Sequence, residues 1–326
     1  MATVLTVILN YKTAEMTLQA VQAALREMAG IRGEIVVVDN ESQDGSFETL
    51  LAQVPPGVRV IQSGRNGGFG AGNNVGIRAG LSDGSRPDYV YVLNSDAFPD
   101  AGAIRSLLET LEKTPGAGIA GSFIHGPDGV PHLTTFRFPT IASEFEGAVR
   151  FGPVSRLLAS RAVPVPIPAS TVEVDWLAGA SLLMRQSVLD QIGLFDEAFF
   201  LYFEETDLCR RAQNAGHKVM FVRQSAVTHI GSASTGMKQW SRVPGYWFDS
   251  RWHYFRKNHG AGYALTATAA HVVGAMLHRL RCLLTGKKPA DPPHFLRTLI
   301  LHSVGLRPKS EHLRSRPTTR NLTGTP

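Results

Sequence analysis

A β-α-β pattern opens with Thr3-Val4-Leu5-Thr6-Val7-Ile8-Leu9 and decides the fold class of this 326-residue chain. The run is continuously apolar or β-branched, which is typical of a strand buried on both faces of a parallel sheet. A helix is predicted next, with Thr13 as its N-cap, and a second buried strand follows at 34–40. Asn10 and Asp39 then stand at the carboxyl ends of neighbouring strands, where open α/β sheets bind ligands.

The alternation of strands and helices continues outward from this opening. Strands are predicted at 58–62 and 89–93, and a helix around 73–81, so the first hundred residues indicate a nucleotide-binding α/β half. Residues 125–170 carry loop signals and look like a variable insertion, and a strand with small residues in its middle is predicted from Val174 to Arg185. The fold class predicted is α/β, with a Rossmann-like, mostly parallel sheet flanked by helices.

The composition indicates a globular protein of a reducing compartment. Hydrophobic residues make up 43% of the chain, which is enough for a sizeable core. Cys209 and Cys282 form no disulfide framework or zinc pattern. The N-terminus lacks the pattern of a secretory signal, so a cytoplasmic protein is expected. The net charge of +6 arises from ten Lys or Arg against two acids after residue 278, and this basic extension favours anionic lipid over nucleic acid as a partner.

The glycine-rich segment Gly64-Arg65-Asn66-Gly67-Gly68-Phe69-Gly70-Ala71-Gly72-Asn73-Asn74 resembles a phosphate-binding loop only loosely. It fits neither G-x-G-x-x-G nor G-x-x-x-x-G-K-[ST], which argues against a Rossmann dehydrogenase and a P-loop NTPase. Its glycines would let the backbone approach a ligand before a helix N-terminus, but a purely structural loop explains them equally well.

Asp96 follows the strand that ends at Leu93, in the sequence Asn94-Ser95-Asp96, where an α/β enzyme can hold a hard divalent cation. A strand-to-helix turn capped by Asn94 or Ser95 is the alternative. His229 follows a later predicted strand and could join Asp96 on a metal, although a lone histidine at a strand end is more often structural.

An aromatic run stops at three carboxylates in the stretch from Phe199 to Arg211, which reads FFLYFEETDLCRR. Desolvation and like charge both favour the protonated form of a carboxyl group, so a catalytic base is a candidate function of this cluster. The alternative is a helix start, with Glu204 and Glu205 at the positive end of the helix dipole and Asp207 paired with an arginine one turn later.

Residues 261–278 contain no Asp, Glu, Lys or Arg. The segment is short and weakly apolar for a transmembrane span, so it is expected either to lie at a membrane interface or to pack on the main domain. Residues from Pro308 onward are rich in Arg, Ser, Thr and Pro and are expected to be disordered.

Seven motifs in order, over about residues 3 to 259, resemble inverting glycosyltransferases of family 2, and above all the rhamnosyltransferase-like branch. They are TVILNYK, VVVDNES, GRNGGFGAGNN, VLNSDA, VDWLAGASLLMR, FFLYFEETDLCRR and THIGSAS. The resemblance implies a GT-A fold, a nucleotide diphosphosugar donor, a Mg or Mn ion and an acceptor hydroxyl activated by a carboxylate. It favours dTDP-rhamnose as donor and a glycan or lipid-linked saccharide of the cell envelope as acceptor, with UDP-hexose donors open.

The resemblance also implies roles for individual positions. Glu205 matches the base position, with Glu204 as the second candidate, and Asp96 and His229 match metal-binding positions. The donor and acceptor positions are Asn10, Asp39, Asn66, Gly67, Gly68, Asn94, Asp175, Trp176 and Gly179.

The same resemblance divides the chain into three parts. Residues 1–124 are the expected nucleotide-sugar half, 125–259 the acceptor and catalytic half, and 260–326 a helical, basic extension. A sugar-1-phosphate nucleotidyltransferase is disfavoured because Asn10-Tyr11-Lys12 stands where its glycine-rich loop would follow the first strand. A catalytically silent sugar-nucleotide-binding protein, and peripheral attachment to the inner face of the cytoplasmic membrane, remain open.

Overall fold

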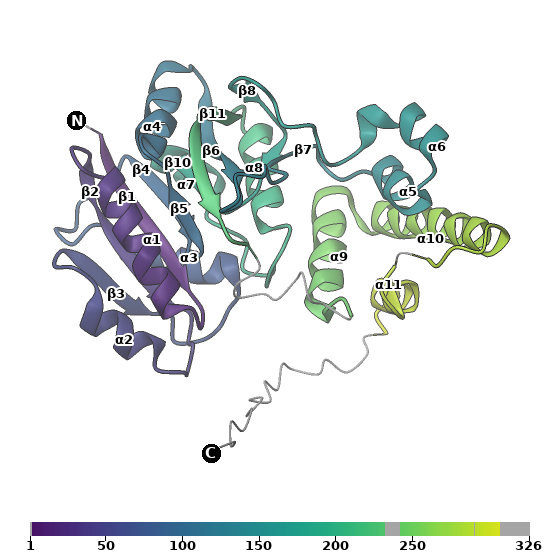
Figure 1. Ribbon diagram of the computed structural model, residues 1–326, viewed down its shortest axis with the longest axis horizontal. Coiled ribbons are helices and arrows are strands. Elements are labelled where there is room, and N and C mark those ends of the chain that lie inside the picture. Colours follow the sequence, from purple (N-terminus) through teal and green to yellow (C-terminus); the bar gives the residue numbers. More distant parts are fainter. Residues whose placement is uncertain (1, 232–241, 290, 307–326) are drawn as a thin grey trace, which may run out of the picture.

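The computed structural model describes residues 2–231, 242–289 and 291–306 (Figure 1). Its main sheet has the strand order β3-β2-β1-β4-β10-β6-β11-β5, with β8 beside β11, and β7 pairs with β9 separately. The strands are β1 (Thr3–Asn10), β2 (Arg32–Asp39), β3 (Val58–Gln62), β4 (Tyr89–Asn94), β5 (Ala97–Pro99), β6 (Ala117–His125), β7 (Thr135–Phe136), β8 (Val172–Glu173), β9 (Trp176–Leu177), β10 (Ser181–Arg185) and β11 (Lys218–His229).

Helices cover both faces of this sheet, and a second group lies beside it (Figure 1). They are α1 (Ala14–Glu27), α2 (Ser46–Gln53), α3 (Phe69–Ala79), α4 (Ala103–Lys113), α5 (Ile141–Val149), α6 (Gly152–Leu157), α7 (Gln186–Ile192), α8 (Glu204–Asn214), α9 (Gly245–His259), α10 (Ala261–Leu284) and α11 (Phe295–Ser303), with a 3-10 turn at Ala159–Arg161.

The first strand confirms the expected burial on both faces. Val4 and Ile8 pack in one hydrophobic core with α1 and α4. Leu5 and Val7 point the opposite way, into a second core shared with α3, α7 and α8. Because successive side chains of a strand alternate between faces, only a sheet covered on both sides buries all four. Strands β3, β2, β1 and β4 are mutually parallel, whereas β10 runs antiparallel between β4 and β6.

Three predicted boundaries differ from the structure. The strand expected from Val174 to Arg185 is interrupted at Ala178–Ala180, which separates β9 from β10. The insertion at 125–170 contains helices α5 and α6, and α5 begins at a capping box in which Thr140 and Ser143 exchange hydrogen bonds. The helix expected from Asn73 begins earlier, at Phe69. Turn-like composition hid these helix starts, because glycine and proline were read as loop signals.

Helices α5, α9, α10 and α11 form the second group, held by small hydrophobic cores. A buried ion pair lies between three of them: Arg251 of α9 contacts Glu144 of α5 at 2.9 Å, and His271 of α10 contacts the same carboxylate at 2.8 Å. Burial would raise the pKa of Glu144, but the charge of Arg251 and the hydrogen bond with His271 lower it to about 2. The group is therefore organised around an ionised buried glutamate.

No helix in the described parts of the chain is long and apolar enough to cross a bilayer. The tail predicted to be disordered from Pro308 lies outside the described residues.

Candidate active site

Polar residues meet at the carboxyl edge of the parallel strands. The β1–β2 register pairs Asn10 with Asp39, and the β1–β4 register pairs Leu9 with Asn94. The chain enters antiparallel β10 at the same edge, where the backbone N–H of Asn94 donates to the carbonyl of Ala180 at 3.0 Å. The edge therefore brings together candidates that are far apart in sequence, from Asn10 to Asn94, and places them beside the start of β10.

Asn10 and Asp39 are in direct contact. The Asn10 amide donates to the Asp39 carboxylate at 2.7 Å, and both side chains are fully buried. Ser42 donates to the same carboxylate through its hydroxyl, at 2.5 Å, and through its backbone N–H, at 3.0 Å. Sequence reasoning missed Ser42, although its place three residues after Asp39 is typical of a side chain that closes a turn. A preformed polar cluster thus ends β1 and β2.

The glycine loop is held by side chains and packed on the acidic stretch. Asn66 accepts hydrogen bonds from Asn40 at 3.0 Å and from the backbone of Gly68 at 3.1 Å. Gly68 has φ +88°, and a Cβ there would lie 1.8 Å from the carbonyl oxygen of Phe200. That carbonyl accepts from the N–H of Phe69 at 2.9 Å. The loop therefore needs glycine at 68 because it touches the backbone of the aromatic run.

Helix α8 starts with an unusual backbone. Tyr202 and Phe203 both have φ of +70°, a left-handed conformation that costs a non-glycine residue about 1–2 kcal/mol each. Two such residues in succession redirect the chain immediately before Glu204. Strained backbone of this kind occurs where the surrounding structure enforces it, and often at functional sites.

Glu204 and Glu205 are the first two residues of α8, and each has a buried Oε2 without a hydrogen-bond partner among the described residues. Burial raises the pKa of Glu205 to about 7 against opposing backbone hydrogen bonds. Burial, and then the charge of Glu205, raise the pKa of Glu204 well above its usual range. The pKa of both carboxyl groups is therefore raised, and Glu205 is the more accessible of the two.

Gly179 connects this pair with the strand edge. A Cβ at Gly179 would lie 3.8 Å from the Cβ of Glu205 and 3.4 Å from the ring of Phe69. Its neighbour Ala180 accepts the hydrogen bond from Asn94. The Gly179–Ala180 backbone therefore lies between the glutamate pair and the candidate metal residues.

Asp96 and His229 are brought together, with the Asp96 Oδ1 and His229 Nε2 3.0 Å apart. The Asn94 amide lies 3.4 Å from the same imidazole, and its buried Oδ1 has no hydrogen-bond partner within the described ranges. Two side-chain oxygens and one imidazole nitrogen suit a divalent ion such as Mg or Mn. No group of three or more His, Cys, Asp or Glu side chains with metal-binding geometry occurs in the described residues.

Asp175 and Trp176 have partners within the protein. The Asp175 carboxylate accepts from the backbone N–H of Phe138 at 2.9 Å. The Trp176 indole donates to the carbonyl of Arg137 at 2.9 Å and stacks on Phe136 with ring centroids 4.2 Å apart. These contacts fix the wall formed by β7 and β9, and a sugar or acceptor contact for either side chain stays a prediction.

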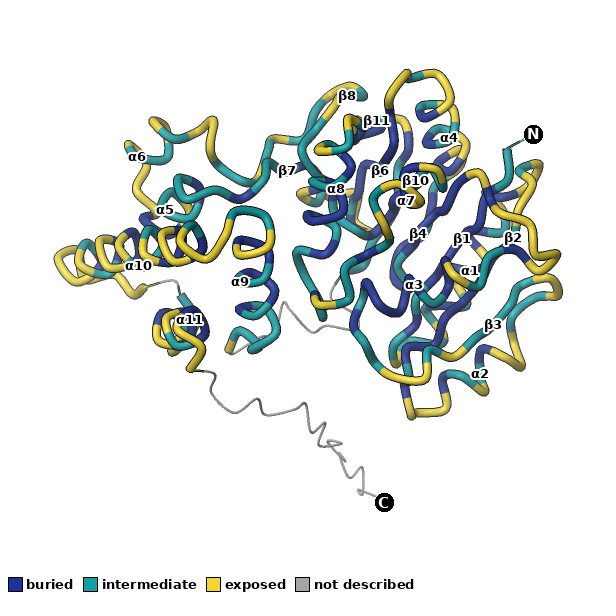
Figure 2. Tube along the Cα trace, turned by 180° about the vertical axis from the view of Figure 1, so that it is seen from behind, coloured by how far each residue is buried: buried dark blue, intermediate teal, exposed yellow. Residues whose placement is uncertain are grey.

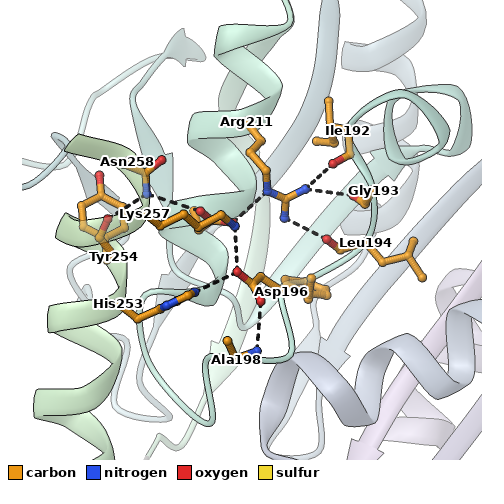
Figure 3. Close-up of polar contacts among 12 residues, drawn as sticks. Ile192, Gly193, Leu194, Asp196, Ala198, Arg211, His253, Tyr254, Lys257 and Asn258 are labelled. Carbon is orange, nitrogen blue, oxygen red and sulfur yellow. Dashed lines mark hydrogen bonds and ion pairs between the residues drawn. The ribbon is translucent and has the colours of Figure 1, made fainter. Parts of the chain in front are cut away.

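A charged network anchors α8 behind the glutamates (Figure 3). The fully buried Asp207 accepts from Arg211 at 2.8 Å and from Lys257 of α9 at 2.9 Å. Lys257 also contacts Asp196 at 2.8 Å, and His253 contacts the same carboxylate at 3.0 Å. Both Arg210 and Arg211 lie about one turn after Asp207, and Arg211 is the one that forms the pair. The contacts from α9 were missed, because nothing in a single sequence pairs positions 50 residues apart.

Comparisons with known proteins agree with this architecture. Residues 2–244 match the family described as "Glycosyltransferase like family 2". The chain is 32% identical over 217 residues to the N-acetylglucosaminyl-diphospho-decaprenol L-rhamnosyltransferase of Mycobacterium tuberculosis, covering 62% of this chain and 68% of that protein. It is 28% identical over 193 residues to the rhamnosyltransferase WbbL of Escherichia coli, covering 58% and 69%.

Among solved structures, the mannosyltransferase of Pyrobaculum calidifontis in complex with GDP-mannose and Mn2+ is similar in fold, with a TM-score of 0.53, 14% identity and coverage of 93% of this chain and 86% of that one. The expected GT-A fold, an α/β sheet flanked by helices with a C-terminal helical extension, is confirmed. The match over three quarters of the length, the rhamnosyltransferase relatives and the fold lead to one conclusion: the chain belongs to glycosyltransferase family 2, in its rhamnosyltransferase-like branch.

Proposed function

We propose that this enzyme transfers a sugar, with rhamnose favoured, from a nucleotide diphosphate donor to a hydroxyl group of a glycan or lipid-linked saccharide, with inversion at the anomeric carbon. The observation that carries the proposal is Glu205. Its carboxyl group is buried at the start of α8, close to the Gly179 backbone, and its pKa of about 7 is suited to a general base at neutral pH.

In this mechanism Glu205 removes the proton of the acceptor hydroxyl as its oxygen attacks the anomeric carbon from the face opposite the diphosphate. One displacement inverts the configuration, so a second catalytic carboxylate is not required. Glu204 is the second candidate for the base, and burial, followed by the charge of Glu205, raises its pKa well above the usual range. General-base assistance of this kind typically contributes ~10²- to 10⁴-fold in rate.

The donor would lie along the carboxyl edge. Asn10 and Asp39 form the polar end of β1 and β2 and would contact the nucleoside, and the loop from Asn66 through Gly67 and Gly68 would approach the diphosphate. In this arrangement residues 1–124 bind the nucleotide sugar and residues 125–259 hold the acceptor and the base, as the sequence predicts.

A divalent ion fits the residues present. Asp96 and His229, with the buried amide oxygen of Asn94, would hold Mg or Mn. When bound, such an ion neutralises negative charge on a diphosphate leaving group. Calorimetry tests this role: Asp96→Ala should lose the Mn-dependent part of donor binding, and equal binding with and without Mn in both proteins would contradict it.

The donor and acceptor are inferred from the relatives. Two relatives are rhamnosyltransferases, and one of them is named for a decaprenol-linked substrate, which favours dTDP-rhamnose and a polyprenyl-linked saccharide. A UDP-hexose is the alternative donor. A lipid-linked acceptor would bring the enzyme to a membrane surface, which agrees with the peripheral contact expected from the basic C-terminal region.

One experiment separates this enzyme from a silent sugar-nucleotide-binding protein. Thermal shifts against a panel of nucleotide sugars with Mg or Mn identify the donor, because a ligand that binds the folded state raises the melting temperature. Transfer from that donor to a polyprenyl-linked acceptor is then followed by radiolabel. A donor that binds without turnover, with every acceptor supplied, would favour the silent protein.

A further inference from the structure

In helix α10 small residues face the protein and large apolar residues face solvent, which is the reverse of a typical amphipathic surface helix. Its buried positions are mostly small residues, among them Ala264, Ala267, Gly274 and Ala275. Gly274 lies against α5 so closely that a Cβ there would come within 2.8 Å of the carbonyl oxygen of Phe145. Small residues let two helices approach, but they leave the large side chains of α10 on the opposite side.

These large side chains form a continuous apolar stripe on the solvent side. The apolar stripe consists of Leu265, Val273, Met276, Leu277, Leu280, Leu283 and Leu284, of which Leu283 and Leu284 are 79% and 78% exposed. From Val273 to Leu284 its members recur every three or four residues, so they share one helix face. Exposed positions follow α10 along its length (Figure 2). At 1.5 Å per residue, the 24-residue helix is about 36 Å long.

An aromatic residue outside α10 borders this surface. Phe151, just before α6, is 43% exposed and lies under the guanidinium of Arg281, 4.9 Å from ring centroid to carbon. Leu157 at the end of α6 is 82% exposed. Soluble monomers rarely expose contiguous apolar surface of this kind without a binding partner.

The charges beside the apolar stripe identify the partner. Helix α10 contains no Asp or Glu; of the two arginines in its last two turns, Arg279 lies 4.0 Å from Asp291 and Arg281 donates to backbone carbonyls before α6. Lys287 and Lys288 follow the helix and are exposed. A second copy of α10 would offer these cations no acid of its own, whereas anionic headgroups would. An apolar helix face flanked by Lys and Arg is typical of a helix lying in a membrane interface.

We propose that the apolar stripe of α10, with Phe151 beside its last turns, is a membrane-docking surface that binds bilayers containing anionic lipid. The stripe enters the headgroup region, and the exposed Lys287 and Lys288 contact lipid phosphates. This binding needs no transfer activity and is independent of the proposed reaction. It also explains how one segment satisfies both expectations from the sequence, since one face of α10 packs on the protein and the other meets lipid.

Docking through α10 would bring the catalytic stretch near the membrane. Helix α9 precedes α10 and its aromatic residues contact the run before α8: Tyr246 lies 5.3 Å from Phe200 and Trp247 lies 6.1 Å from Phe203, between ring centroids. The helices that carry the docking surface are therefore in contact with the segment that positions Glu205.

Vesicle flotation of the full-length chain tests the proposal. The probes are vesicles of phosphatidylcholine alone and with added phosphatidylglycerol. The wild type should float with the anionic vesicles, and a Leu283→Asp, Leu284→Asp double variant should bind at least about tenfold more weakly, because two apolar side chains leave the interface. Leu51→Asp on α2, at a leucine that is 59% exposed, is the matched control and should float like wild type.

Two further arms make the result decisive. The double variant Lys287→Gln, Lys288→Gln should bind anionic vesicles more weakly than the wild type, and its vesicle binding should depend less on salt concentration. The proposal would be overturned if the double leucine variant floated as well as the wild type. It would also be overturned if deletion of the residues after 306 abolished vesicle binding while the leucine changes had no effect. If the wild type instead sediments as a dimer, does not bind vesicles, and becomes a monomer on the leucine changes, the surface is assigned to a second copy of the chain. Melting curves verify that each variant is folded.

Discussion

The pH dependence of transfer distinguishes the two glutamates at the start of α8. If Glu205 is the base, only its ionised form is active, and its pKa of about 7 makes the ionised fraction rise about tenfold between pH 6 and pH 8. The rate should therefore rise with pH over this interval and level off above it. The apparent pKa belongs to the coupled pair, because the two carboxyl groups influence each other.

Two variants assign the titrating group. Glu205→Gln should lose ~10²- to 10⁴-fold in rate and also lose the rise between pH 6 and 8, while still binding donor. Glu204→Gln should keep most of the rate, because a neutral amide replaces a carboxyl group whose pKa is raised well above its usual range. Its pH profile should also keep the same shape.

The assay measures transfer of radiolabelled sugar from the donor to a polyprenyl-linked acceptor at saturating donor concentration. Calorimetry measures the affinity for the donor separately. The reverse pattern, in which Glu205→Gln stays active with an unchanged profile and Glu204→Gln is inactive, would refute the assignment of Glu205. A flat profile in the wild type would refute the pKa argument itself.

Three other predictions concern the scaffold of the site. Gly68→Ala should abolish donor binding or folding. Gly64→Ala is the control: Gly64 also has a positive φ, but a Cβ there would have no neighbour within 4 Å. Thermal melts and donor titrations of this control should show only the modest cost of backbone strain. Lys257→Met should lower the free energy of unfolding by about 1.5–3 kcal/mol in urea titrations, because the buried Asp207 loses a charged hydrogen-bond donor; no change would mean that Arg211 suffices. The lowered pKa of Glu144 implies stability that is present above about pH 4.5 and lost as pH falls toward 2, so Glu144→Gln should flatten the acid limb of thermal melts, and an unchanged acid limb would contradict this.

Local patterns predicted much of the architecture. The apolar run at Thr3–Asn10 forms β1, and the polar ends of β1 and β2 meet as their positions require. The Asp207–Arg211 pair follows from i,i+4 spacing on a helix. These features depend on residues that are close in sequence or on the general rule that ligands bind at the carboxyl edge of a sheet.

Non-local contacts carried by backbone could not be predicted. The glycine loop and the aromatic run gave separate signals, but nothing indicated that Phe69 would donate to the Phe200 carbonyl. The left-handed Tyr202 and Phe203 were equally hidden, because neither residue type favours that conformation. The inward face of helix α10 could not be predicted for a different reason: its composition is balanced, and only the packing shows that its small residues face inward.

The hydrogen bond between the Phe69 N–H and the Phe200 carbonyl has a consequence for engineering donor preference. Since the junction uses main-chain atoms, exchanging the side chains around it, apart from Gly68, would leave its geometry intact, which favours point changes elsewhere in the loop. A chimera that grafts a whole loop from a relative would have to import the Phe199–Phe203 run as well. We expect chimeras that take both segments from one parent to fold, and chimeras that take them from different parents to fold less well.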